Sequence, residues 1–145
     1  MTKRVRGHCL IIDNEKFIND VLPSREGSMI DSNNLDLLFE QLHFKVVVRR
    51  NLGYQDMIRT VNNFSKLEDH AEAQMCAVII LSHGDAGGLI NAADGKEVPT
   101  EYVLRKFNND ACPLLKGKPK FFVFQACRGD EVDFGTIPRL FLIFI

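Results

Sequence analysis

Four short apolar runs recur along the chain. They fall at residues 9–12, 46–48, 76–81 and 121–124, and each is rich in β-branched or aromatic residues. Runs of this length and composition predict strands that are buried on both faces rather than solvated on one.

Apolar residues at helical intervals lie between these runs. Three such patterns occur, at residues 35–42 after Ser32-Asn33-Asn34, at 57–67 after Asp56, and from Thr100 to about Phe107 before Pro113. Short polar residues such as Ser32 favour helix N-caps, and Pro113 prevents continuation of the third helix. The chain therefore alternates predicted strands with predicted helices.

This alternation predicts an α/β fold, a three-layer αβα sandwich around a mainly parallel sheet. Residues 87–98, with Asp94-Gly95 at their centre, predict a small surface hairpin beside that sheet. Ligands of such sheets bind outside the carboxyl ends of the strands, so the residues that follow each strand are the candidates for a site.

Composition narrows the class of protein. A chain of 145 residues with 46% hydrophobic content fits one compact domain. Lys and Arg total 18 against 19 for Asp and Glu, a balance that argues against nucleic acid or an anionic membrane as partner.

The apolar run at 9–12 is too short for a secretory signal, and residues 139–145 fall far short of the roughly 20 needed to span a bilayer. We expect an intracellular, cytoplasmic protein.

The four cysteines form no CxxC pair, so reduced thiols are expected. Cys9 and Cys76 lie inside apolar runs, where a thiol is typically buried and inert. Cys112 precedes Pro113 in a polar connection. Cys127 differs because it follows an apolar run and is itself followed by Arg128 and Gly129.

Two predicted strands end in side chains that can do chemistry, His83 and Cys127. Neighbouring strands lie about 4.8 Å apart, so a histidine and a thiol at one edge of a sheet can meet across a substrate. Either residue alone is more typical of packing or solvation, and spacing leaves both the structural and the catalytic interpretation open.

The residues around these two side chains resemble the caspase family of cysteine endopeptidases. Gln125-Ala126-Cys127-Arg128-Gly129 is similar to the active-site pentapeptide of caspases, which have a histidine about 50 residues upstream. His83 stands 127 − 83 = 44 positions earlier, within Leu81-Ser82-His83-Gly84. Pro23-Ser24-Arg25-Glu26-Gly27, followed by Asp31, resembles the family's first active-site loop. The resemblance runs from about Gly7 to Gly135.

The resemblance implies a role for each matching residue. Cys127 is expected to attack the scissile carbonyl while His83 handles protons, and the N–H groups of Cys127 and Gly84 are expected to form the oxyanion hole. The Pro23 carbonyl is expected to orient His83. Arg25 and Gln125 are expected to bind the side chain of a P1 aspartate. A guanidinium fork and an amide suit a carboxylate, and no metal or other cofactor is implied.

Caspases consist of a large and a small subunit, and the resemblance covers only the large one. We expect residues 1–135 to be the large-subunit catalytic domain and residues 136–145 to be a non-family apolar tail. The sheet is then incomplete without the small subunit, and the tail can add a strand to its open edge or promote self-association.

The predicted function is that of a cysteine endopeptidase subunit that cleaves protein substrates after aspartate, in apoptosis or related proteolytic signalling. Its expected partners are a caspase small subunit or another caspase chain. The alternative is a catalytically incompetent form that binds and regulates caspases. A nucleotide-binding module is disfavoured because residues 84–88 lack the Lys-Ser/Thr of a phosphate loop. Asp130-Glu131-Val132-Asp133 is read either as a processing site or as a solvated acidic loop.

Overall fold

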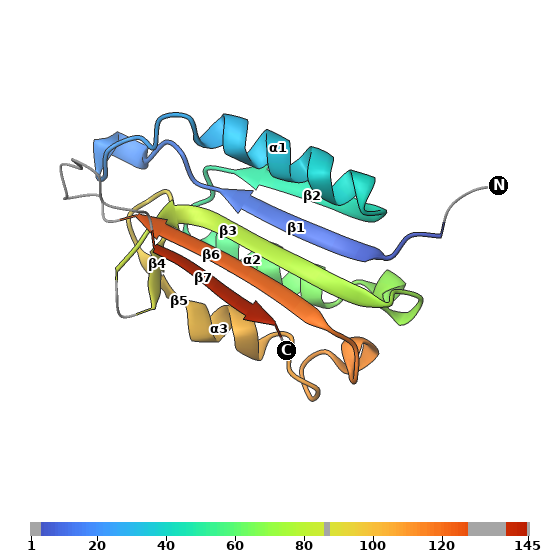
Figure 1. Cartoon of the computed structure of the whole chain (residues 1–145). Helices are drawn as coiled ribbons and strands as arrows, with labels where there is room; N and C mark the ends of the chain where they lie inside the picture. The colour runs from blue at the N-terminus through green and yellow to red at the C-terminus, as the bar shows by residue number, and fades with distance from the viewer. Residues whose placement is uncertain (1–3, 86–87, 128–138, 145) are drawn as a thin grey trace.

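A five-stranded sheet runs through the middle of the computed structural model, which describes residues 4–85, 88–127 and 139–144 (Figure 1). The elements in chain order are β1 (Gly7–Asp13), η1 (Ile18–Asp20), α1 (Ser28–Gln41), β2 (Phe44–Arg50), α2 (Tyr54–Ser65), η2 (Glu68–Ala71), β3 (Met75–His83), β4 (Leu89–Asn91), β5 (Glu97–Pro99), α3 (Thr100–Arg105), η3 (Pro113–Leu115), β6 (Lys120–Cys127) and β7 (Arg139–Phe144).

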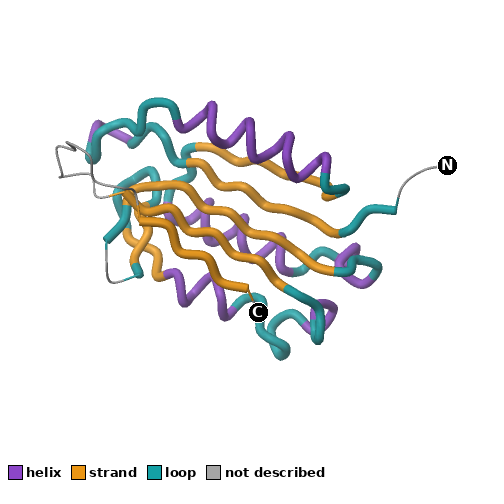
Figure 2. The backbone as a smooth tube through the Cα atoms, in the orientation of Figure 1, coloured by secondary structure: helices purple, strands orange, loops and turns teal. Residues whose placement is uncertain are grey.

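The strand order is β2-β1-β3-β6-β7. The first four strands are parallel, and β7 pairs antiparallel with β6. Helix α1 covers one face of the sheet, while α2 and α3 cover the other (Figures 1 and 2). The predicted α/β sandwich with a mainly parallel sheet is therefore confirmed.

Each face of the sheet has its own core. Cys9, Ile11 and Ile79 pack under Phe39 of α1. The alternate residues of the same strands, Leu10 and Ile80 among them, pack against α2 and α3 on the other face. Because side chains alternate along a strand, burial on both faces produces the continuous apolar runs seen in the sequence.

The structure corrects two details of the sequence analysis. Helix α1 begins at Ser28, after Gly27 with its left-handed φ of 83°, so Ser32 lies inside the helix and does not cap it. Strand β2 is half-exposed over Val46, Val47 and Val48, because it forms an edge of the sheet and is only partly covered.

Two smaller predictions are confirmed. The hairpin expected at 87–98 is formed by β4 and β5, which pair antiparallel. The apolar C-terminal segment adds a strand to the edge of β6, with Phe121 opposite Phe144 and Ala126 opposite Arg139. The segment 130–133, read as a processing site or a solvated loop, lies outside the described residues.

Candidate active site at the carboxyl edge of the sheet

His83 and Cys127 are neighbours across the sheet. They are register partners in the parallel pair β3 and β6, and each is the last residue of its strand. Parallel neighbours lie about 4.8 Å apart, so the two backbones reach the carboxyl edge side by side. The side chain of Cys127 lies outside the described part of the structure.

The ring of His83 is held in place from two sides. Its Nε2–H donates to the Pro23 carbonyl at 2.6 Å, which is the contact expected from the sequence. The ring of Phe17 packs against it with a centroid distance of 5.0 Å. Because a carbonyl can only accept, this bond places the proton of a neutral imidazole on Nε2 and leaves Nδ1 as the basic nitrogen.

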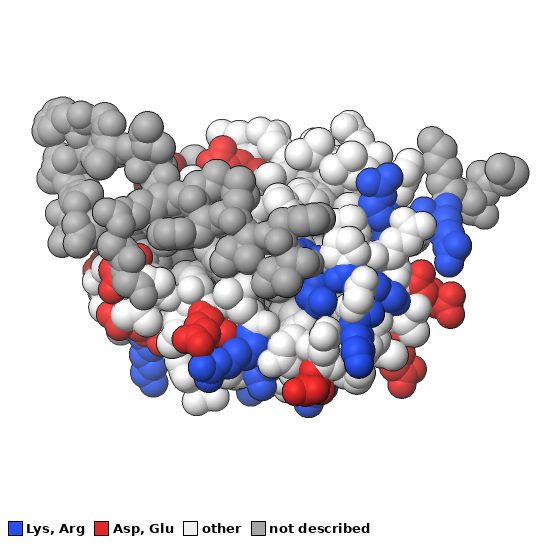
Figure 3. All heavy atoms as spheres, turned by 60° about the horizontal axis from the view of Figure 1, so that its bottom comes forward, with Lys and Arg blue, Asp and Glu red and all other residues white. Residues whose placement is uncertain are grey.

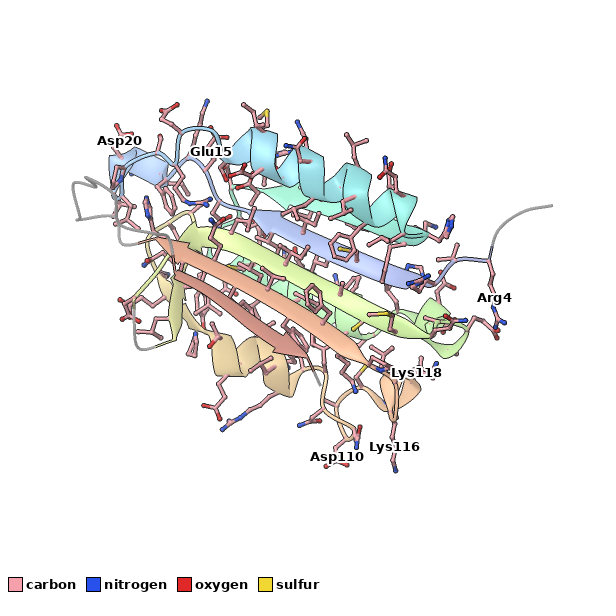
Figure 4. The ribbon with its side chains drawn as sticks, viewed as in Figure 1. Arg4, Glu15, Asp20, Asp110, Lys116 and Lys118 are labelled. Carbon is pink, nitrogen blue, oxygen red and sulfur yellow. The ribbon has the colours of Figure 1, made fainter. Side chains whose placement is uncertain are left out.

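The segment that carries Pro23 and Arg25 is tied to the rest of the edge through its backbone. Ile18 N–H donates to the Ala93 carbonyl at 2.7 Å, and Arg25 N–H donates to the Glu15 carbonyl at 2.8 Å. Figure 4 labels Glu15 and Asp20 in this segment at one end of the sheet, with Arg4, Asp110, Lys116 and Lys118 at the other. The proposed site and the basic residues of the last loops therefore lie at opposite ends.

Gly84 follows β3 at a point of close backbone approach. A Cβ placed there would lie 2.4 Å from the Leu89 carbonyl oxygen and 2.7 Å from Ala126 Cβ, so no larger residue fits. The family resemblance implies an oxyanion-hole role for the N–H of this glycine, and the structure adds a requirement for glycine from the protein's own β4 and β6. The corresponding Gly129 lies outside the described residues.

Arg25 is buried and held by a charged cluster. The residue is 9% exposed, and its Nη1 donates to Asp13 Oδ1 at 3.3 Å, to the Asn14 carbonyl at 3.1 Å and to Ser28 Oγ at 2.8 Å. An arginine alone in a loop is more often solvated, yet this one points inward. Asp13 is fully buried and was not singled out from the sequence, although it directly ends the first apolar run.

Gln125 lies in the same row of the sheet as this cluster. Asp13 is the register partner of Leu81, which is in turn the partner of Gln125. Leu81 packs on the α1 face, so alternation places Asp13 and Gln125 on that face too. The described residues show no hydrogen bond between Arg25 and Gln125, and two strand spacings, about 10 Å, separate Gln125 from Asp13, to which Arg25 is bonded.

The other cysteines are buried away from the site. Burial raises the pKa of Cys76 to about 12 and raises the pKa of Cys9 still further. Cys112 Sγ donates to the Ser65 carbonyl at 3.1 Å, and burial raises its pKa as well. All three are unpaired in the part of the chain that the structure describes, so the expected burial of Cys9 and Cys76 is confirmed, while their inertness stays a prediction.

Surface charge and potential metal ligands identify no additional site residues in the described part of the chain. On the face shown in Figure 3, basic side chains gather right of centre, while most acidic side chains lie around the margins of the view. Within the described residues, no group of three or more His, Cys, Asp or Glu side chains is arranged to hold a metal ion. None of the described helices is long and apolar enough to cross a membrane.

Comparison with known proteins agrees with this geometry. A family model described as the caspase domain matches residues 6–139. Caspase-2 of Gallus gallus is 41% identical over 135 residues, and the match covers 92% of this chain and 32% of that protein. Caspase-9 of Homo sapiens is 39% identical over 136 residues, covering 89% and 32%. Caspase-3 of Bos taurus is 37% identical over 130 residues, covering 89% and 46%.

The chain thus spans less than half the length of each of these relatives, and the match includes both His83 and Cys127. The match reaches four residues into the segment 136–145 that the sequence analysis set apart. The sheet, the paired ends of β3 and β6 and the extent of the family match all agree. The chain therefore belongs to the caspase family of cysteine peptidases.

Proposed function

We propose that this chain is the large-subunit portion of a cysteine endopeptidase that cleaves protein substrates after aspartate, in apoptosis or related proteolytic signalling. The observation that carries the proposal is the register pairing of His83 with Cys127 at the carboxyl edge. The bond from His83 Nε2–H to the Pro23 carbonyl supports it, because it presents Nδ1 as a base.

The reaction divides between these two side chains. His83 Nδ1 takes the proton of the Cys127 thiol, and the sulfur attacks the scissile carbonyl carbon. The tetrahedral intermediate collapses as His83 gives its proton to the departing amine, which leaves a thioester. Water then attacks the thioester with His83 as base, which releases the carboxylic acid and restores the thiol.

The oxyanion of the intermediate requires N–H donors, and we assign them to Cys127 and Gly84. Cys76 N–H donates to the Pro119 carbonyl, and the Leu81 carbonyl accepts from Asn14 N–H. Even-numbered residues of β3 therefore turn their N–H groups toward β6, and odd-numbered residues turn theirs toward β1. Continued past His83, this alternation aims the Gly84 N–H at the side on which Cys127 lies.

The aspartate selectivity is assigned to Arg25 and Gln125. Burial of Arg25 and its place on the α1 face with Gln125 support a shared pocket for the P1 side chain. A buried guanidinium favours a carboxylate over its neutral amide isostere, whereas Gln125 can donate to either. Arg25 is therefore the residue expected to discriminate by charge.

The activity is proposed to need a partner, either a caspase small subunit or another caspase chain. The test is cleavage of an Asp-P1 peptide by the purified chain with and without a small subunit expressed separately. We expect cleavage to appear with the small subunit and to vanish in the Cys127→Ala variant. An Asn-P1 version of the peptide is the matched substrate control.

A regulator that binds caspases without cutting is the second candidate, and the same experiment separates it from the first. The regulator is supported if the chain forms a stable complex with a small subunit, the complex cleaves nothing, and Cys127→Ala binds equally well. Cleavage without any added partner would show that the chain is sufficient by itself.

A further inference from the structure

A buried charged cluster at the end of β1 is not explained by the two catalytic side chains. Asp13 is fully buried and lies between two arginines, Arg25 on Oδ1 at 3.3 Å and Arg50 on Oδ2 at 3.0 Å. Ser28 Oγ also donates to Oδ1, and Ser32 Oγ donates to Oδ2 at 2.7 Å. Every oxygen of this carboxylate therefore has an ionic and a hydroxyl partner.

Arg25 uses one nitrogen of its guanidinium, Nη1, to bind this cluster. All of its hydrogen bonds within the described residues go through Nη1, to Asp13, Asn14 and Ser28. Its Nε is buried and has no partner among them. An unpaired buried donor on a charged group is costly, and the edge formed by Nε and Nη2 has the spacing of a carboxylate. Nε and Nη2 are thus the donors of Arg25 that the described cluster does not use.

Arg50 decides the charge that this edge presents. Its Nη1 donates to Asp13 and to Ser32 Oγ at 2.7 Å, and its Nη2 donates to Asn33 Oδ1 at 2.8 Å. Two guanidiniums against one carboxylate give 2 − 1 = +1, so a positive charge remains for a ligand. Without Arg50 the carboxylate of Asp13 would offset the charge of Arg25, and the sum would be zero.

We propose that Arg50 is a specificity-determining positioning residue of the P1 pocket: by neutralising Asp13, it leaves Arg25 free to hold a substrate carboxylate on its Nε edge. Arg50 acts through Asp13 and does not touch the substrate. This inference rests on the proposed function, because it assumes that the P1 side chain reaches Arg25.

The chain supplies a matched control one residue away. Arg49 is the neighbour of Arg50 in β2, and its side chain is exposed on the opposite face, where Nη1 donates to the Val48 carbonyl at 3.0 Å. Arg49→Gln removes the same unit of charge without touching Asp13. Arg50→Gln keeps a hydrogen-bond donor near Asp13 while it removes the charge, so the pair separates local charge from total charge.

The test is direct binding to the full chain. The probes are two capped peptides, acetyl-Asp-Glu-Val-Asp-amide, which copies residues 130–133, and the same peptide ending in Asn. The NMR signal of the Arg25 Nε–H, assigned by its loss in Arg25→Lys, reports the site. We expect the Asp peptide to shift this signal and to bind at least about tenfold more tightly than the Asn peptide.

The expected effect of Arg50→Gln is a fall of about tenfold in this preference, with the preference retained in Arg49→Gln. Arg50→Lys, which keeps the charge, should keep the preference. If Arg50→Gln does not fold, as judged by its thermal transition, Arg50→Lys decides: loss of the preference there overturns the role assigned to charge.

Two further results overturn the inference. One is an equal preference in Arg50→Gln and Arg49→Gln, and the other is an Arg25 Nε–H that does not respond to the Asp peptide. These outcomes differ from a failure of the proposed function, which is judged by cleavage that depends on Cys127. The chain can bind the carboxylate and never cut, or cut after aspartate with no dependence on Arg50.

Discussion

His83 and His70 are nearly the same in their immediate surroundings. Both rings are buried, with His83 6% and His70 0% exposed. Each Nε2–H donates to a backbone carbonyl, at 2.6 Å to Pro23 and at 2.7 Å to Phe64. Each ring also packs against a phenylalanine, with centroid distances of 5.0 Å and 5.1 Å.

The two differ in what lies beyond the ring. His70 belongs to η2, before β3 at the amino end of the sheet, and its second ring neighbour is His8 at 5.7 Å. Its Nδ1 is buried and has no partner among the described residues. His83 ends β3 beside the end of β6 and its Cys127. A histidine bonded to a carbonyl is therefore no sign of catalysis. The position of His83 on the carboxyl edge and its register partner are what distinguish its proposed catalytic role from that of His70.

The largest expected effect comes from removing each histidine in turn. In the chain paired with a small subunit, His83→Ala should lower kcat/KM for an Asp-P1 peptide by at least about a thousandfold, because the proposed mechanism uses this ring for both thiol activation and proton delivery. His70→Ala should change kcat/KM by less than about threefold, measured per folded molecule. Comparable losses in the two variants would show that the structural resemblance extends to function.

The second expectation concerns the free energy of unfolding, which His70→Ala should lower more than His83→Ala does. His70→Ala should cost about 3 kcal/mol, because it leaves a cavity and an unpaired Phe64 carbonyl in the interior. His83→Ala should cost about 1 kcal/mol, because its bond to the Pro23 carbonyl is only partly buried and water can take the place of the ring. Urea unfolding of both variants measures the difference, and a greater loss in His83→Ala would contradict the assignment of His70 as structural.

Stability should also fall in mild acid because of the amino-end histidines. Burial lowers the pKa of His70 and of His8, although Asp69 opposes this for both. Above about pH 6.5 both histidines are neutral in the folded and in the unfolded state, so they do not reduce the free energy of unfolding. As the pH falls below about 6.5, these histidines take up protons in the unfolded chain but not in the folded chain. Each of the two therefore lowers the free energy of unfolding by at most about 1.4 kcal/mol per pH unit.

The measurement is urea unfolding at pH 7.5 and pH 5.5. His70→Gln should weaken the pH dependence, since one of the two groups is then gone, while His83→Gln tests whether the carboxyl edge contributes. A chain equally stable at the two pH values would contradict the idea that His70 and His8 are kept neutral by the fold.

The smallest expected effect is the labelling of the buried thiols. With their pKa values raised by burial, Cys9 and Cys76 should react with iodoacetamide far more slowly at pH 7.5 than they do in the unfolded chain. Cys112 should be protected in the same way. Peptide mass mapping after brief alkylation gives the rate at each site, and rapid modification of Cys76 would contradict its burial.

The sequence predicted the sheet and the carboxyl edge because those depend on local patterns. Apolar runs mark buried strands, alternation with helices makes them parallel, and parallel strands place His83 and Cys127 at one edge. Pro23, recognised only through the family resemblance, is 60 residues from His83 and yet bonded to it. Spacing alone could not have found this contact.

The charged cluster was missed for a related reason. Asp13 and Arg50 are 37 residues apart, and their pairing depends on the parallel register of β1 and β2, which no local pattern reports. Ser32 was read as a helix cap because it is a short polar residue just before an apolar helical pattern, whereas in the structure its hydroxyl donates to Asp13. A carboxylate directly after an apolar strand is the signal in the sequence that could have drawn attention to this edge.

The central claim is that His83 acts on Cys127, and the alkylation rate of Cys127 as a function of pH tests it most directly. The chain needs no substrate or partner for this measurement, and peptide mapping separates Cys127 from the three buried thiols. The account predicts that wild type forms reactive thiolate at lower pH than His83→Gln, while His70→Gln follows wild type. Identical pH profiles in wild type and His83→Gln would contradict it.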